Sequence, residues 1–242
     1  MNPLFAVIYE DEDLLVVHKP ADLVCHPTKG DEYSSLISRA RIYLRTESEP
    51  RLVHRLDRET SGLVLLAKTV AAARELGQVW ESRAVTKEYL ALVHGHVASA
   101  QQVIDAPLGK DTASVVAIKD CVRPDGAAAV TEIFVEELFY HADEPFTHLR
   151  AVPRTGRKHQ IRIHLQHAGH PIVGDKLYGG DPDLYLALVE HRLTAEQRAR
   201  LLLPTHALHA ARLRFSWRGR DWDFAAEPEA AFVEFMAKSG LT

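Results

Sequence analysis

Residues 54–68 of the chain read HRLDRETSGLVLLAK, a polar stretch that runs directly into an apolar one. The polar part combines histidine, arginine, acidic and hydroxyl side chains within a few positions. The apolar run at residues 63–67 is typical of a fully buried strand. Active sites are commonly built from reactive groups on a loop that a rigid buried element holds in place. Taken alone, the stretch also fits a plain polar turn before a core strand, so its meaning depends on other segments.

The composition predicts a globular protein. The chain has 242 residues, of which 46% are hydrophobic and 26% charged, enough for one large domain or two fused lobes. Its two cysteines, Cys25 and Cys121, are far apart and lack CxxC spacing, which argues against a disulfide framework or a cysteine zinc site and favours a reducing compartment. Residues 1–7 do not resemble a signal segment, and no apolar run approaches the roughly 18 residues of a membrane span. We therefore expect a soluble, cytoplasmic protein without membrane contact.

The charge pattern is informative although the net charge is only −4. Residues 1–50 carry five Lys/Arg against nine Asp/Glu, whereas residues 151–200 carry eight against five. Between Pro145 and Gly174 there is no acidic residue, and five histidines accompany the basic side chains. A local positive field of this kind guides a polyanion to a protein surface, although a solvated basic face gives the same pattern.

Hydrophobic spacing and capping signals predict a mixture of strands and helices. Strands are expected at residues 6–9, 14–18, 63–67, 85–94, 130–136, 148–152 and 207–217. Helices are expected after caps at Ser34-Ser35 and Thr69, at residues 158–168 and at residues 229–237. Residues 101–128 are expected to form short strands and loops, with a turn at residues 124–126. Because regular βαβ alternation is missing, an α+β class is favoured over a doubly wound sheet.

Two further segments complete the pattern of the opening stretch. Residues 87–91 read KEYLA, with Tyr89 in a predicted strand, and residues 155–162 read TGRKHQIR. In this order and spacing, and together with residues 8–20, 169–178 and 208–210, these segments resemble the RluA-type family of RNA pseudouridine synthases. The resemblance spans most of the chain.

The resemblance implies both a fold and an activity. The fold is the α+β pseudouridine synthase fold, a mixed and largely antiparallel sheet flanked by helices with a central RNA-binding cleft. Residues 1–242 would form a single catalytic domain of two fused lobes with the active site between them. The reaction is the isomerisation of uridine to pseudouridine in structured RNA, tRNA or rRNA, by breaking the C1′–N1 bond, rotating the uracil and rejoining it through C5. No metal or organic cofactor is implied, and we expect a monomer without an obligate protein partner.

Three residues take catalytic roles by this resemblance. Asp57 matches the essential aspartate, and a carboxylate can stabilise or attack C1′ as that centre gains positive character. The ester, base-adduct and glycal routes all stay open. Arg162 matches the arginine that pairs with this aspartate and keeps it ionised. Tyr89 matches the active-site tyrosine, whose ring can pack against the flipped uracil; proton transfer by its hydroxyl is a hypothesis.

Other residues are expected to bind the RNA or to support the pocket. Arg55 matches the side chain that fills the stack vacated by the flipped base, with a phosphate contact as the alternative role. The start of the helix expected at residue 158 favours phosphate binding, and the candidates there are Arg157, Lys158 and His159. His54 and Gln160 are expected to support the pocket by hydrogen bonding.

The chain also departs from the family pattern. It begins almost at once with the catalytic pattern, so we expect no S4-type RNA-binding domain and RNA selection by residues 22–50 and 101–128. Residues 215–218 read FSWR where many relatives have a His-Pro pair. The RKHQ sequence at residues 157–160 resembles that of the branch acting on tRNA.

Two classes of protein compete with this interpretation. A metal hydrolase would use the histidines, but their spacing lacks the HExxH pattern and a nearby acid. The histidines concerned are His164, His167, His170, His206 and His209. An RNA-binding module without activity would keep the basic face but have no need for Asp57, Tyr89 and Arg162 together.

Overall fold

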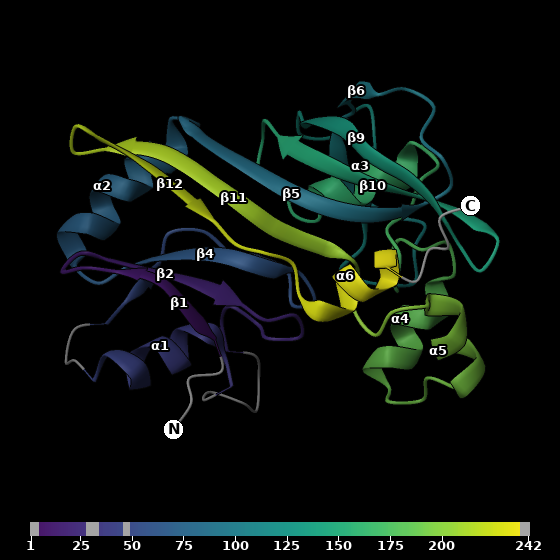
Figure 1. Cartoon of the computed structure of the whole chain (residues 1–242), viewed down its shortest axis with the longest axis horizontal. Coiled ribbons are helices and arrows are strands. Elements are labelled where there is room, and N and C mark those ends of the chain that lie inside the picture. The colour runs from purple at the N-terminus through teal and green to yellow at the C-terminus, as the bar shows by residue number, and fades with distance from the viewer. Residues whose placement is uncertain (1–4, 28–33, 46–48, 238–242) are drawn as a thin grey trace. The chain divides into compact units, whose positions relative to one another are not determined.

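The computed structural model describes residues 5–27, 34–45 and 49–237. The chain divides into two compact units. Figure 1 labels most of the helices and strands that make them up. The first unit comprises Met1–Lys87 and His209–Glu229, and the second comprises Glu88–Leu208 and Ala230–Thr242. Each unit is built from a sheet with flanking helices, as expected for an α+β protein.

The sheet of the first unit has the strand order β1-β2-β4-β11-β12, with the short β3 also paired to β4. The pairings are antiparallel except that of β4 with β11, which is parallel. The strands are β1 Ala6–Glu10, β2 Leu14–Lys19, β3 Arg51–Leu52, β4 Ser61–Ala67, β11 Leu208–Trp217 and β12 Arg220–Ala225. Every residue of β4 is buried, as predicted for the apolar run after the polar motif.

Two helices belong to the first unit, α1 Leu36–Leu44 and α2 Val70–Glu81. Both begin where the capping signals predicted. The Ser35 side chain accepts a hydrogen bond from the backbone N–H of Ser38, and the Thr69 side chain accepts one from that of Ala72. Helix α2 buries Ala72 and Leu76 in the core that it shares with β4.

Gly62 allows β11 to approach the start of β4. It lies opposite Ala210 in the parallel pair and has a φ of +109°. A Cβ atom at this position would lie 2.3 Å from the carbonyl oxygen of Ala210. Next to it, the Ser61 Oγ is 2.9 Å from Nδ1 of His209, whose Nε2 donates to the carbonyl of Ala226 at 2.9 Å. The last residues of the polar motif therefore fix the junction of β4 and β11.

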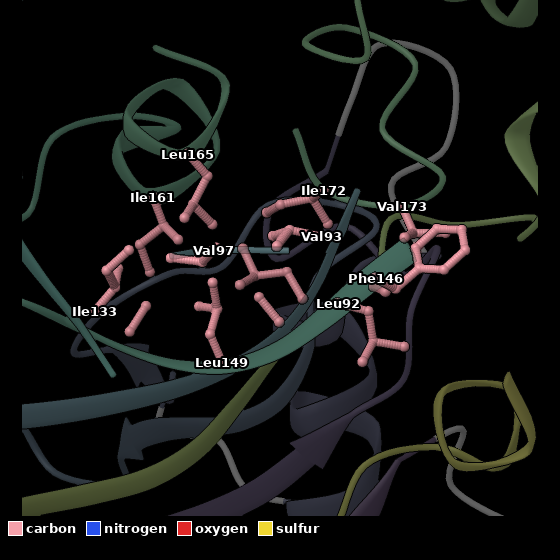
Figure 2. Close-up of a cluster of buried hydrophobic side chains, with 14 of the residues drawn as sticks. Leu92, Val93, Val97, Ile133, Phe146, Leu149, Ile161, Leu165, Ile172 and Val173 are labelled. Carbon is pink, nitrogen blue, oxygen red and sulfur yellow. The ribbon is translucent and has the colours of Figure 1, made fainter. Parts of the chain in front are cut away.

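The main sheet of the second unit has the order β5-β10-β9-β6, all antiparallel, and β7 and β8 form a separate hairpin. The strands are β5 Val85–His94, β6 Gln101–Asp105, β7 Leu108–Lys110, β8 Asp120–Val122, β9 Val130–His141 and β10 Glu144–Pro153. The helices are α3 Gln160–His167, α4 Pro182–Val189, α5 Ala195–Leu201 and α6 Ala230–Ala237. Figure 2 shows Ile161 and Leu165 of α3 facing Ile133 and Leu149 of the sheet, within one buried cluster.

The structure corrects several predicted boundaries. The strands expected at residues 130–136 and 148–152 are longer, because β9 and β10 continue to a tight hairpin turn at residues 142–143, both with positive φ. Helix α3 begins at Gln160 and not at Lys158, because His159 takes a left-handed conformation with a φ of 55°. Strand β12 and helices α4 and α5 were not predicted. Of the helices in the described part of the chain, none is long and apolar enough to cross a membrane.

Candidate active site

The backbone around Asp57 is held by a buried lysine. Lys19, the last residue of β2, has no solvent exposure, and its Nζ donates to three carbonyl oxygens. These are the carbonyls of Pro20 and Leu23 at 2.8 Å each and that of Arg58 at 2.9 Å. Because Arg58 directly follows Asp57, this lysine ties the motif loop to the end of a core strand.

Burial lowers the pKa of Lys19 to about 8, although nearby acidic groups act in the opposite direction. Among these groups are Cys25, Glu229 and Asp57. Near neutral pH the amine therefore carries its proton and donates to the three carbonyls. A buried cation so close to Asp57 attracts its carboxylate, and low polarity around the lysine strengthens that attraction.

Leu56 is held from the other side by a cysteine. Its backbone N–H donates to Sγ of Cys25 at 3.4 Å, and its carbonyl lies 3.5 Å from the same sulfur. Burial raises the pKa of the Cys25 thiol, so the sulfur keeps its proton for the bond to the carbonyl. The backbone N–H of Thr60 donates to the carbonyl of Asp57 at 3.2 Å and closes the turn that carries the aspartate. Both residues that flank Asp57 are thus fixed through their backbones.

His54 connects the start of the motif to β4. Its Nε2 accepts a hydrogen bond from the backbone N–H of Leu65 at 3.2 Å, and its ring stacks on Trp80 with centroids 5.5 Å apart. Burial, with a smaller effect from Lys87, lowers the pKa of His54 to about 3. The neutral ring is the form that accepts this bond. These contacts tie the start of the motif to β4 and α2.

Arg55 and Asp57 differ in exposure. The Arg55 side chain is exposed, and no hydrogen bond or ion pair holds it to the described residues, whereas Asp57 is half-buried. The next arginine, Arg58, is exposed too but pairs with Asp22, with Nε 2.7 Å from the carboxylate. Of the two motif arginines, Arg55 is therefore the one able to reorient towards a bound molecule.

In the second unit, Arg162 is buried in α3 and forms a two-pronged ion pair. Its Nε lies 2.7 Å from Oδ2 of Asp175, and its Nη2 lies 2.9 Å from Oδ1. The guanidinium carbon also lies 5.0 Å from the ring centroid of Tyr178. A fork of this geometry fixes the plane of the guanidinium as well as its position.

The carboxylate of Asp175 is itself anchored. Its Oδ1 accepts the backbone N–H groups of Leu177 and Tyr178 at 2.9 Å each. Burial alone raises the pKa of Asp175, but the charge and hydrogen bonds of Arg162, the charge of His206 and the Tyr178 amide bring it well below its usual range. Asp175 therefore stays ionised at every pH at which the protein is expected to work.

Gln160 is a hub of hydrogen bonds at the start of α3. Its Oε1 accepts from Thr155 Oγ1 at 2.7 Å and from the backbone N–H of Arg157 at 3.0 Å. Its Nε2 donates to the carbonyl of Val130 at 2.9 Å and to Thr131 Oγ1 at 3.0 Å. The side chain thus ties the loop before α3 to β9.

The three basic residues before α3 are engaged with neighbouring segments. Arg157 donates to the carbonyl of Ala128. Lys158 donates to the carbonyl of Ile118 and pairs with Asp120. Nδ1 of His159 lies within hydrogen-bond distance of the Tyr178 hydroxyl. Arg157 and Lys158 remain exposed in spite of these contacts. They line the entry to α3 with positive charge, where a phosphate contact was expected.

Tyr89 lies in β5, opposite Ala151 of β10, and is half-buried. Its ring packs against the core cluster of the second unit. The predicted site residues therefore fall in both units. Arg55 and Asp57 belong to the first, and Tyr89 and Arg162 to the second.

Three histidines of the rival metal site, His164, His170 and His209, make hydrogen bonds within the fold. His164 has no exposure; its Nε2 donates to the Ala106 carbonyl at 2.9 Å, and its Nδ1 lies 2.8 Å from Thr131 Oγ1. His170 Nδ1 lies 3.0 Å from the carbonyl of His94. Within residues 5–27, 34–45 and 49–237, no group of three or more His, Cys, Asp or Glu side chains is arranged to hold a metal ion. The histidine spacing in the sequence is thus not a ligand set in the described structure.

Comparison with known families decides the classification. The family model described as RNA pseudouridylate synthase matches residues 13–167, which include the whole loop around Asp57 and the helix with Arg162. The chain belongs to this family. Its α+β fold is that of the pseudouridine synthases, with a mixed, mostly antiparallel sheet and flanking helices.

Individual relatives agree with the assignment to the pseudouridine synthases. The chain is 38% identical over 179 residues to ribosomal large subunit pseudouridine synthase D of Escherichia coli (strain K12), covering 73% of this chain and 53% of that protein. It is 36% identical over 233 residues to the protein of the same name from Vibrio cholerae, covering 94% of this chain and 68% of the relative. The chain therefore spans about half the length of several curated relatives that it matches.

Solved structures of pseudouridine synthases have the same fold. Human RNA pseudouridylate synthase domain containing 1 superposes with a TM-score of 0.74 at 27% identity, covering 93% of this chain and 83% of the other. Human RNA pseudouridylate synthase domain containing 4 gives a TM-score of 0.73 at 25% identity, covering 96% and 92%.

Two structural residues of the candidate site were not singled out from the sequence. Lys19 ends the apolar run of β2, a position where a fully buried cation is unusual. Asp175 is the first acid after the acid-free stretch from Pro145 to Gly174. A buried charge requires a partner, so the first acid after a run of cations was a readable candidate for a counter-ion.

Proposed function

We propose that this protein isomerises uridine to pseudouridine in structured RNA. The observation that carries the proposal is the loop around Asp57, which lies within the family match and is fixed through its backbone by Lys19 and Cys25. A backbone held in this way keeps the residue that carries the carboxylate in place while the glycosidic bond breaks, which favours stabilisation of a developing charge.

Each named residue has a role in this proposal. Asp57 stabilises or attacks C1′ of the target nucleotide, and Tyr89 and Arg162 take part in the same reaction, the tyrosine by packing against the uracil. Arg55 fills the stack from which the base is extruded, since its side chain is exposed and held by no described residue. Arg157, Lys158 and His159 bind phosphates of the RNA. We expect the reaction to require neither a metal ion nor an organic cofactor.

We propose ribosomal RNA as the first substrate to test, and tRNA as the second. The support is that curated relatives with 36–39% identity bear the name ribosomal large subunit pseudouridine synthase D. Pseudouridine maps of total rRNA and tRNA from cells with and without the gene should differ at one or a few uridines. Identical maps of both RNA classes would contradict this substrate assignment.

The direct test of the activity is to incubate the purified protein with candidate transcripts and map pseudouridine by carbodiimide modification. We expect conversion in buffer with EDTA, and a loss of at least about 100-fold for Asp57→Asn, the size of effect expected when a charged catalytic group is removed. The matched control is Asp22→Asn, which removes an exposed carboxylate of the same unit that pairs only with the surface residue Arg58 among the described contacts. Full activity of Asp57→Asn would refute the mechanism.

The role of Arg55 is tested with two substrates that differ in base pairing. Extruding a stacked base costs a few kcal/mol, so Arg55→Ala should lower turnover by about 10- to 100-fold on a paired target. On a substrate whose target uridine is already unpaired, the loss should be small. Arg51→Ala, another exposed arginine of the first unit, is the control. Equal losses on both substrates would assign Arg55 to phosphate binding instead.

A further inference from the structure

We propose that Asp175 is a positioning residue for the reaction, because it fixes the orientation of the Arg162 guanidinium through their two-pronged pair. The inference rests on the proposed function, in which Arg162 takes part in catalysis. By this inference, turnover depends on a residue that lies outside the three segments at residues 54–68, 87–91 and 155–162.

The geometry of the pair carries the first step. Asp175 contacts Nε and Nη2 of Arg162, at 2.7 and 2.9 Å, so it holds one edge of the guanidinium. The opposite edge, with Nη1, is thereby turned away from Asp175. Since a guanidinium is planar and rigid, fixing one edge also fixes the direction in which the other edge donates.

The surroundings of Asp175 carry the second step. The backbone around it is closely packed, and two of its amides bind the carboxylate. A Cβ atom on Gly174 would lie 2.4 Å from the carbonyl oxygen of Thr205, and one on Gly179 would lie 2.3 Å from that of Asp175. The backbone N–H groups at positions 177 and 178 bind Oδ1, as described above. The carboxylate is therefore anchored by contacts that do not involve the arginine.

The ring of Tyr178 fixes the face of the guanidinium, which is the third step. This ring lies 5.0 Å from the guanidinium carbon of Arg162. Its hydroxyl lies 3.0 Å from Nδ1 of His159 and 3.4 Å from the backbone N–H of Asp120, and the side chain is almost fully buried. Arg162 thus meets a fixed acid at its edge and a fixed ring at its face, both from the segment that follows α3.

A role in stability alone is the competing explanation. Burying two charges is costly, and apolar pairs of similar size often stabilise a protein as well or better. The two explanations differ in what they predict for turnover. A stabilising pair changes the unfolding transition, whereas a positioning residue changes kcat on folded protein, because displacing a catalytic group by about 1 Å can cost about 100-fold in rate.

The main experiment compares Asp175→Glu with the wild-type protein. Glutamate keeps the charge, but its extra methylene group moves the carboxylate farther from the backbone. We expect the variant to be folded by circular dichroism, with kcat lowered at least 10-fold and KM changed less than threefold. The matched control is Asp183→Glu, since Asp183 makes a similar two-pronged pair with Arg192 on the surface of the same unit. Wild-type kcat in folded Asp175→Glu would overturn the proposal.

A double variant tests whether Asp175 acts through Arg162. Arg162→Met/Asp175→Asn has no buried charge at either position, so it should fold more readily than either single variant. We expect its kcat to equal that of Arg162→Met alone. If the double variant instead lost kcat relative to Arg162→Met by the same factor that Asp175→Asn alone loses relative to the wild type, Asp175 would act independently of Arg162. That result would overturn the proposal.

A measurement on the unreacted protein separates this inference from the proposed function. The Nε–H of Arg162 should give a 15N–1H signal protected from solvent exchange in the wild type, lost or shifted in Asp175→Glu and unchanged in Asp183→Glu. An unchanged signal in Asp175→Glu would refute the positioning role whether or not the protein acts on RNA. Absence of pseudouridine formation by the wild-type protein on both rRNA and tRNA would refute the proposed function and leave the signal unaffected.

Discussion

The change Gly62→Ala should destabilise the first unit strongly. The new methyl group would lie 2.3 Å from the carbonyl oxygen of Ala210 and 2.7 Å from its backbone nitrogen, inside the parallel pairing of β4 with β11. Backbone strain of a non-glycine residue at φ +109° adds roughly 1–3 kcal/mol. Forcing a methyl into a packed site costs about another 1–3 kcal/mol. Together these effects predict a loss of about 2–6 kcal/mol in the free energy of unfolding.

Gly77→Ala is the matched control, because it makes the same change with the opposite expected sign. Gly77 lies inside α2, and a Cβ atom there would meet nothing within 4 Å. Alanine should therefore raise the stability by up to about 1 kcal/mol, the difference in helix propensity. Urea unfolding followed by tryptophan fluorescence is the assay. All three tryptophans of the chain, Trp80, Trp217 and Trp222, belong to the first unit, so the signal reports that unit alone.

The reasoning is refuted by either of two results. One is a Gly62→Ala protein whose free energy of unfolding stays within about 0.5 kcal/mol of the wild type, with an unchanged dependence on urea concentration. A difference of this size is usual for harmless surface changes. The other is a Gly77→Ala protein that loses as much stability as Gly62→Ala. Either result would mean that the close approach of β11 to β4 is not what requires the glycine.

Three further predictions use the same unfolding assay. Lys19→Met should lower the free energy of unfolding by about 2 kcal/mol. Three carbonyls lose a charged donor, and this loss exceeds the gain from no longer burying a charge. An unchanged free energy of unfolding would contradict the role of this lysine as the anchor of the loop. Thr69→Ala should cost about 1 kcal/mol through loss of the cap on Ala72, with no loss expected if the cap is irrelevant. Burial lowers the pKa of His209 to about 4, below its unfolded value of 6.5. Between these two pH values the unfolded chain binds more protons than the folded one. The free energy of unfolding should therefore fall by up to about 3 kcal/mol as the pH drops from 6.5 to 4. The stability gap between wild type and His209→Asn should therefore narrow from pH 7 to pH 4.5, and a constant gap would exclude His209 as the titrating group.

Much of the fold was predictable because it depends on local signals. The apolar run of β4 predicted a fully buried strand, and the hydroxyl residues Ser35 and Thr69 predicted the starts of α1 and α2. Two elements that were not predicted also had local signals. Helix α5 begins with a capping box between Thr194 and Gln197, and β12 follows a turn at residues 218–219 with Trp222 and Phe224 at alternate positions.

The remaining features depend on contacts that spacing along the chain does not encode. Helix α3 starts at residue 160 because His159 adopts a positive φ next to Tyr178, a tertiary contact across 19 residues. Helix α4 is apolar on nearly every side, so its sequence lacks the periodicity that separates a helix from a strand. The partners of Lys19 are carbonyl groups, which every residue possesses, so no sequence pattern could have indicated them.

The way the Asp57 loop is anchored explains how rigidity and function coexist in one short segment. Lys19, Cys25 and His54 all bind backbone groups, at positions 58, 56 and 65 respectively. These anchors therefore fix the path of the chain without using the side chains of Arg55 and Asp57. Because the anchors bind backbone atoms, a bound molecule can meet the exposed side chain of Arg55 without breaking any of the anchoring hydrogen bonds. A loop held by its backbone can keep Asp57 half-buried and Arg55 exposed, the arrangement that their proposed roles in bond breaking and stacking require.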